Sequence, residues 1–167
     1  MKIAIVSDTH GNAPNFKKVL DWIKKEKIKL VIHCGDIGSP SMLEEMIKDF
    51  PSRMHLVFGN IEDRYRITKT VYESGRKNVI LHGELGEIKI DGKKIAFCHF
   101  PRFAKALAQT QKYDIVFYGH THKPWEEKIG KCRLVNPGNL SGFPYKATFA
   151  VYDTETDKLE LKILEKL

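Results

Sequence analysis

The sequence predicts an α/β (α+β) fold in which two mixed β-sheets pack face to face with helices outside each, a four-layer αββα sandwich. Two observations lead to this fold class. In the first half of the chain, short apolar runs alternate with helical patterns, as in a sheet covered by helices. In the second half, short strand patterns follow one another with few helices between them. No linker separates the halves, so we expect one domain over residues 1–167.

The first half is expected to contain three strand and helix pairs. The run from Lys2 to Ser7 is apolar on both faces, which is typical of a central strand in a covered sheet. Pro14 and apolar residues at helical spacing predict a helix that continues to about Lys27. The remaining elements of this half are a strand over 30–33, a helix from 39 to before 51, a strand over 53–58 and a helical pattern over 63–74.

The second half is expected to be mainly β-structure and to look antiparallel. Asp91-Gly92 is a dipeptide typical of tight hairpins and joins two of its strand patterns. A short helix is expected from Phe103 to Gln111, directly before an apolar run. The expected strands cover 79–82, 87–91, 94–98, 114–118, 126–129, 132–135, 148–152 and 158–164.

Length and composition are those of a soluble globular protein. The chain has 167 residues, of which 42% are hydrophobic and 29% charged, enough to bury a core without disulfides or metal staples. No apolar stretch approaches the roughly 20 residues of a membrane-spanning helix, so we expect a cytoplasmic protein without membrane contact. The three cysteines show no CxxC spacing, and we interpret them as core thiols, with metal binding by Cys34 and Cys98 as the alternative.

A net charge of +7 raises the question of a nucleic-acid partner. The lysines are spread over amphipathic helices, without an arginine-rich block or interleaved aromatic residues. We therefore interpret most of them as solvated surface charges and rank nucleic acid below a small molecule as the partner. Apolar residues such as Trp125, Phe143 and Tyr145 either form an interface in a homo-oligomer or pack beside the site.

Side chains that can bind metal follow five of the predicted strands. In chain order they are Asp8, His10, Asp36, Asn60, His99, His120 and His122. Because sites in open α/β sheets form outside the carboxyl ends of the strands, we expect these residues to meet. Two carboxylates, one amide and four imidazoles suit manganese, iron, nickel, cobalt or zinc, and not a structural zinc site rich in cysteine. Seven donors exceed the needs of one ion, but a shared carboxylate would divide them between two.

Each of these residues also has a structural interpretation. Asp8 and Asp36 can cap the helices that follow them, and Asn60 can be a turn residue. His120 and His122 can be hydrogen-bonded loop histidines. The combination of five motifs, each after a strand, is what favours metal binding. The remaining histidines, His33, His55 and His82, are interpreted as structural.

The ordered motifs carry a family resemblance. The series Asp8-x-His10, Gly35-Asp36, Gly59-Asn60, His99 and Gly119-His120-x-His122 resembles the calcineurin-like metallophosphoesterase superfamily, in particular its small prokaryotic phosphodiesterase branch. The resemblance implies two divalent metal sites. In this assignment Asp8, His10 and His122 hold one ion, Asn60, His99 and His120 hold the other, and Asp36 bridges them. Mn²⁺ is the expected metal, with Ni²⁺, Fe²⁺, Co²⁺ and Zn²⁺ as alternatives.

The implied activity is that of a phosphoric diester hydrolase. A hydroxide bridging the two ions, oriented by Asp36, would attack a small or activated phosphodiester, and no protein nucleophile is needed. Ile61 stands where many members have a histidine that protonates the leaving group, so no general acid is identified. Diesters with good leaving groups should therefore react fastest. The rival functions are a noncatalytic interaction subunit on the same fold and a nuclease.

Several neighbours of the metal motifs are candidates for substrate contacts or support. Asn12, Phe100 and Arg102 are the candidate substrate-binding residues, although Asn12 can equally start a helix and Arg102 can be a surface charge. Phe100 occupies a position where the family commonly has glycine, which would narrow the pocket or change what enters it. Glu62 stands where the family often has a supporting acidic residue, and 137–139 resembles a turn that the family keeps near the site.

Overall fold

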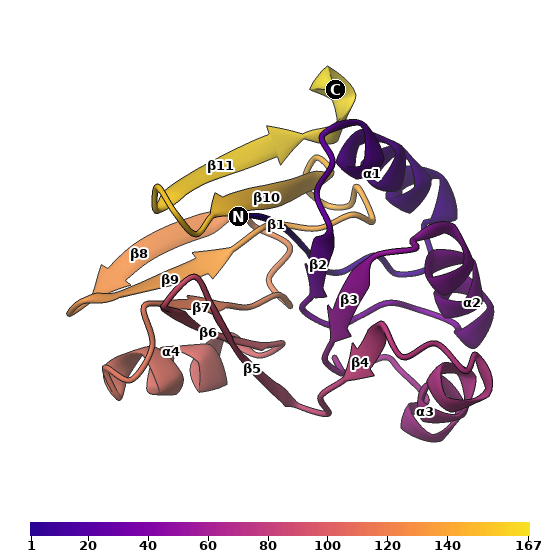
Figure 1. Ribbon diagram of the computed structural model, residues 1–167, viewed down its shortest axis with the longest axis horizontal. Helices are drawn as coiled ribbons and strands as arrows, with labels where there is room; N and C mark the ends of the chain where they lie inside the picture. Colours follow the sequence, from indigo (N-terminus) through magenta and orange to yellow (C-terminus); the bar gives the residue numbers. More distant parts are fainter.

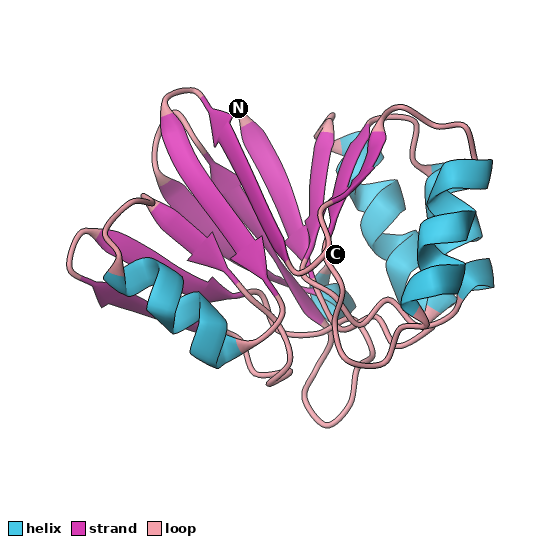
Figure 2. Cartoon of the chain, turned by 90° about the horizontal axis from the view of Figure 1, so that it is seen from below, coloured by secondary structure: helices cyan, strands magenta, loops and turns pink.

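Two mixed β-sheets lie face to face with helices on both outer surfaces, which confirms the predicted sandwich (Figures 1 and 2). The structure is a computed structural model that describes residues 1–167 except the side chain of Asp49. The larger sheet contains, in spatial order, β11 (Lys158–Ile163), β10 (Thr148–Asp153), β1 (Lys2–Val6), β2 (Leu30–His33), β3 (Arg53–Leu56) and β4 (Val79–Leu81). The smaller sheet contains β5 (Leu85–Ile90), β6 (Lys93–Cys98), β7 (Ile115–Phe117), β9 (Cys132–Asn136) and β8 (Trp125–Ile129).

Strand β1 shows why the central strands are apolar on both faces. Ile3 and Ile5 point into the core between the sheets, whereas Ala4 and Val6 point into the core under the helices. All four side chains are fully buried. Successive residues of a strand face opposite sides, so a strand covered on both sides needs apolar residues at every position.

The helices are divided unequally between the two sheets. In the described chain they are α1 (Ala13–Lys25), α2 (Pro40–Asp49), α3 (Arg64–Glu73) and α4 (Pro101–Gln109), with a 3₁₀ turn at Leu164–Lys166. The first three pack on the larger sheet and α4 packs on the smaller one. Among the described residues, none of the helices combines the length and apolar character required to cross a bilayer.

The smaller sheet corrects the prediction of an antiparallel second half. Its central strands β6, β7 and β9 are parallel, and only the edge strands β5 and β8 pair antiparallel. The reason is α4, which carries the chain back between β6 and β7, as a parallel connection requires. This helix begins at Pro101 and not at Phe103, because proline is well suited to the first turn of a helix.

Parallel pairing places the ends of many strands at one edge of the molecule. The strands β1, β2 and β3 run parallel in the larger sheet, as do β6, β7 and β9 in the smaller one. The final hairpin, β10 and β11, joins the larger sheet through an antiparallel pairing with β1. The loops that carry the candidate metal ligands leave from the carboxyl ends of these parallel strands.

Candidate metal centre

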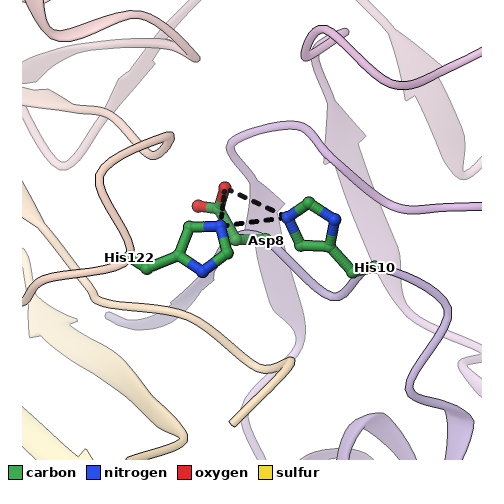
Figure 3. A group of neighbouring side chains, drawn as sticks. All are labelled: Asp8, His10 and His122. Carbon is green, nitrogen blue, oxygen red and sulfur yellow. Dashed lines mark hydrogen bonds and ion pairs between the residues drawn. The ribbon is translucent and has the colours of Figure 1, made fainter. Parts of the chain in front are cut away.

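The structure brings the seven predicted ligands together in two groups that meet at Asp36. The first group is Asp8, His10 and His122, whose side chains point toward one another from two distant loops (Figure 3). The Nε2 atoms of His10 and His122 are 3.0 Å apart. The Oδ1 atom of Asp8 lies 3.3 Å from Nε2 of His122 and 3.8 Å from Nε2 of His10.

The second group is Asn60, His99 and His120. The Oδ1 atom of Asn60 lies 3.1 Å from Nε2 of His99 and 2.9 Å from Nδ1 of His120. These two ring nitrogens are 3.2 Å apart. The three atoms therefore form a compact triangle of donor atoms for a single cation.

Asp36 lies between the groups. Its Oδ2 atom is 3.5 Å from Nε2 of His10 and 3.4 Å from Nε2 of His99. Its Oδ1 atom accepts hydrogen bonds from the backbone N–H groups of Asn60 and Ile61. Burial raises the pKa of Asp36, but the hydrogen bond with His99 and these amide donors outweigh it and lower the pKa to about 2. Asp36 is therefore an anion at neutral pH.

The tautomers of two histidines fit a bound cation. His99 donates its Nδ1–H to the carbonyl of Cys34 at 2.8 Å, and His122 donates its Nδ1–H to the carbonyl of Phe143 at 2.7 Å. A neutral imidazole has one N–H, so in each ring the Nε2 lone pair faces the other donor atoms. Lone pairs that converge on buried carboxylates need a positive charge between them. The donor set thus fits divalent metal.

Two of the imidazoles have a raised pKa because carboxylates surround them. For His10 the main cause is the nearby carboxylate of Asp8, and the charge of Asp36 adds to it. Burial lowers the pKa of His99, but the hydrogen bond and the charge of Asp36 more than offset this. In the absence of a cation these rings therefore bind a proton more readily than free histidine, because the proton partly neutralises the negative charge of the nearby carboxylates.

The loops of the centre contain an unusual backbone conformation. Five of the seven candidate ligands have a positive φ, namely Asp8 (52°), His10 (46°), Asp36 (57°), His120 (70°) and His122 (59°). A non-glycine residue in this region costs roughly 1 to 3 kcal/mol and persists only where the surroundings enforce it. Gly59 and Gly119 allow the close approach: a Cβ atom on Gly59 would collide with the carboxylate of Asp36, and one on Gly119 with the Ser7 hydroxyl.

Buried His33 connects the first two ligand loops and was interpreted from the sequence only as structural. Its Nδ1 accepts a hydrogen bond from the Gly35 N–H at 3.2 Å, and its Nε2 lies 2.8 Å from the hydroxyl of Thr9. Because the amide can only donate, Nε2 carries the ring proton and donates to Thr9. Burial lowers the pKa of His33 to about 4, so the ring is neutral. The side chain therefore ties the Asp8 loop to the Asp36 loop.

Glu62 connects the second and third loops in a similar way. Its carboxylate accepts hydrogen bonds from the backbone N–H of Ile37 at 2.7 Å and of Gly59 at 2.8 Å. Burial raises its pKa. This geometry agrees with the supporting position implied by the resemblance.

The loop after β9 holds the centre from the other side. Asn139 donates to the carbonyl of His122 at 3.0 Å, and the backbone N–H of Ser141 donates to the carbonyl of Asp8 at 2.9 Å. Phe143 supplies the carbonyl that orients His122. The sequence indicated the turn at 137–139, but it contained no signal for a backbone carbonyl at Phe143.

The structural alternatives for three ligands are wrong or incomplete. Helix α1 is capped by Asn12 and helix α2 by Ser39, so neither Asp8 nor Asp36 caps the helix that follows it. Asn60 does lie in a bend, but its side-chain oxygen faces His99 and His120.

Of the three candidate substrate residues, Asn12 and Phe100 lie next to loops or ligands of the centre. Asn12 caps α1, and its amide also donates to the carbonyl of Ser141 at 3.0 Å, which accounts for its place in the fold. Arg102 is exposed in the first turn of α4. Phe100 is 39% exposed and packs against two of the candidate ligands. Whether any of them contacts substrate stays a prediction.

The remaining histidines and the cysteines agree with the structural interpretation. His55 and His82 form a hydrogen bond of 2.7 Å with each other on strand and loop positions outside the two ligand groups. The three cysteines, Cys34, Cys98 and Cys132, are buried and unpaired as thiols. Burial raises the pKa of each thiol, which disfavours the thiolate form that binds metal.

Comparison with known proteins places the chain in a family. The model of the calcineurin-like phosphoesterase superfamily domain matches residues 1–157. The phosphodiesterase MJ0936 of Methanocaldococcus jannaschii is 30% identical over 172 residues, an alignment that covers 99% of this chain and 100% of that protein. A solved structure described as that of a novel archaeal phosphodiesterase has a TM-score of 0.88 at 26% identity and covers 98% of this chain and 99% of its own.

A more distant likeness concerns the fold alone. The structure of Vps29 from Entamoeba histolytica in complex with zinc has a TM-score of 0.67 at 21% identity, covering 98% of this chain and 99% of that one.

The family model spans all five ligand motifs, and the archaeal relatives match over nearly the whole chain. The chain therefore belongs to the calcineurin-like phosphoesterase superfamily, in the small prokaryotic and archaeal branch that its motifs resemble.

Proposed function

We propose that this protein is a metal-dependent phosphodiesterase that hydrolyses small or activated phosphate diesters at a centre of two divalent cations. Asp8, His10 and His122 would hold one cation, Asn60, His99 and His120 the other, and Asp36 would bridge them. Mn²⁺ is the proposed metal, because oxygen and imidazole donors without sulfur suit it. The relatives that carry the name phosphodiesterase support this choice of reaction.

The observation that carries the proposal is the position of Asp36. Its Oδ2 atom lies about equally far from a histidine of each group, at 3.5 Å and 3.4 Å. A carboxylate shared in this way allows seven donors to serve two cations, each with positions free for substrate. A lone cation would leave half of these donors without a function.

The protein's own groups prepare the reaction. When bound, a pair of divalent cations neutralises charge on the phosphoryl oxygens and lowers the pKa of a water molecule toward neutrality. The carbonyls of Cys34 and Phe143 keep the Nε2 lone pairs of His99 and His122 directed inward. The amides of Asn60 and Ile61 hold Asp36 in its anionic form. These hydrogen bonds preorganise the donors before substrate binds.

The proposal is tested by removing the metal and adding single metals back. Each preparation is assayed with bis(p-nitrophenyl) phosphate, with a dialkyl phosphate and with p-nitrophenyl phosphate. We expect the activity to be lost on chelation and restored best by Mn²⁺, and the activated diester to react much faster than the dialkyl one because Ile61 offers no proton. Equal rates for the two diesters would indicate a general acid.

Two variants complete this test. Asp36→Ala should reduce both metal content, measured by elemental analysis, and diester hydrolysis to background. Asp21→Ala is the control, because Asp21 is exposed on α1 and only pairs with Lys17. A chelated preparation that hydrolyses diesters as well as the untreated protein would disprove the proposal.

The likeness to Vps29 motivates a second candidate, an interaction subunit without catalysis. Diester hydrolysis after reconstitution with metal discriminates between the two functions, since an interaction subunit should lack this activity even when it contains metal. A nuclease would instead show binding to DNA or RNA that weakens steeply with salt.

A further inference from the structure

Phe100 lies against the candidate metal ligands but is only partly covered by protein. Its ring centroid is 5.1 Å from that of His99, at an interplanar angle of 78°, and 5.1 Å from that of His120, at 59°. The residue is 39% exposed, whereas His99 behind it is 1% exposed. The phenyl ring therefore contacts two imidazoles of the centre in edge-on or tilted geometry, and the residue is partly exposed to solvent.

Two more exposed apolar residues are attached to backbone that touches the centre. The Ile61 N–H donates to the carboxylate of Asp36 at 3.2 Å, and the Ile61 residue is 44% exposed. The Phe143 carbonyl accepts from His122, and the residue is 78% exposed. We call Ile61, Phe100 and Phe143 the apolar rim. They come from three separate loops, yet the backbone or ring of each contacts a candidate ligand.

The apolar rim limits the kinds of ester group that fit beside the metals. A phosphate held by the centre would have its ester groups near these side chains, because each rim residue contacts a candidate ligand. A sugar or glycerol group without an aromatic substituent presents hydroxyls that need hydrogen-bond partners, and the rim side chains provide none. A planar aromatic group can stack on a partly exposed phenyl ring, an interaction that strengthens binding of a base by about fivefold or more.

We propose that Phe100 is a specificity-determining residue that stacks a planar aromatic group of the substrate, either an aryl group bonded to the phosphate or the base of a nucleotide. This inference rests on the proposed function, because the metals hold the phosphate that brings the ester group to the rim. It goes beyond that function by naming the chemical class of the group that the substrate carries beside its phosphate.

The test compares two phosphate ligands that differ only in the base, adenosine 5′-monophosphate and ribose 5-phosphate. Their binding to the Mn²⁺-loaded protein is measured by calorimetry, which needs no turnover. We expect the nucleotide to bind at least about fivefold more tightly. In Phe100→Ala the two ligands should bind equally, and in Phe100→Tyr, which keeps a ring, the difference should return.

Two further variants separate stacking from other effects. Phe103→Ala is the matched control, because Phe103 is 38% exposed in the helix α4 that directly follows Phe100 but is not in ring contact with the described histidines. It should keep the difference between the ligands. Phe100→Leu keeps apolar volume without a planar ring and should lose most of the difference. Metal content is measured for every variant, so that a loss caused by His99 moving is recognised.

Kinetics with bis(p-nitrophenyl) phosphate give a second readout. If Phe100 binds the aromatic group, Phe100→Ala should raise KM several-fold and leave kcat nearly unchanged. If Phe100 only supports His99, kcat and metal content should fall instead, and the proposal is wrong. The proposal would also be wrong if Phe100→Ala only dissociated an oligomer into monomers and left the difference in affinity between the two phosphate ligands unchanged.

The outcomes distinguish this inference from the proposed function. Tight binding of both phosphates with no difference between them would overturn the role of Phe100 and leave the diesterase proposal standing. Binding of neither phosphate in the presence of Mn²⁺ would contradict both.

Discussion

The two ligand groups contain similar donors but are anchored differently. The side chain of His99 in the second group is fully buried, and its Nδ1–H donates to Cys34, which is itself buried. The side chain of His122 in the first group is 19% exposed, and its Nδ1–H donates to Phe143 in an exposed loop. His10 beside it is 30% exposed. Each group thus contains one buried residue, Asp8 or His99, together with more exposed ones. The comparison teaches that the anchor of His99 lies in the core, whereas the anchor of His122 lies in a surface loop.

The largest expected effect separates the two groups. His99→Asn should lower the affinity for one Mn²⁺ ion by more than about 100-fold, because an outer hydrogen bond alone is worth 10- to 100-fold. His122→Asn should weaken the other site, and excess Mn²⁺ should restore more of its activity because the exposed loop adapts. Calorimetric titration with Mn²⁺ measures both sites. His82→Asn, which removes a histidine outside the centre, is the control. Equal losses in both variants would show that burial does not decide the difference.

A smaller effect is expected at His33, which joins the groups through their loops. His33→Asn can keep the bond from the Gly35 amide, and His33→Gln can keep the bond to Thr9. We expect each to weaken Mn²⁺ binding by about tenfold and His33→Leu, which keeps neither, by up to about 100-fold. Adding Thr9→Val to His33→Asn should reduce the Mn²⁺ affinity little further, since the hydrogen bond to Thr9 is already absent in His33→Asn. Unchanged affinity in His33→Leu would limit the residue to a packing role.

The smallest effect concerns pH. In metal-free protein the pKa values of His10 and His99 are higher in the folded state than in the unfolded state, where they are near 6.5. The protonated rings therefore stabilise the fold fully below pH 6.5, and this stability is lost as the pH rises through the pKa values of the folded state. Metal-free protein should therefore lose melting temperature between pH 6 and 8, and this loss should be smaller in His10→Asn. Mn²⁺ affinity should rise over the same range, because binding displaces the protons. Scanning calorimetry with and without chelator measures the melting temperature at each pH. Melting temperatures that change with pH in the same way in both conditions would contradict the assignment.

Much of the fold could be predicted because burial constrains local composition. The strand at 30–33 was predicted with the bounds that the structure shows, since a strand covered on both faces must be apolar throughout. Parallel pairing in the smaller sheet was missed. Short apolar strands look the same whether their neighbours run parallel or antiparallel, and only the path of α4 decides it.

The sequence by itself determined which side chains are available for the centre, because each candidate ligand directly follows an apolar run that must be a strand. Tertiary structure alone decided their partners: residues 112 positions apart, such as His10 and His122, meet only when the two sheets pack. The same holds for the contacts made by His33, by the Phe143 carbonyl and by the ring of Phe100. Contacts between distant loops depend on the closing of the whole fold, and no local pattern of residues encodes them.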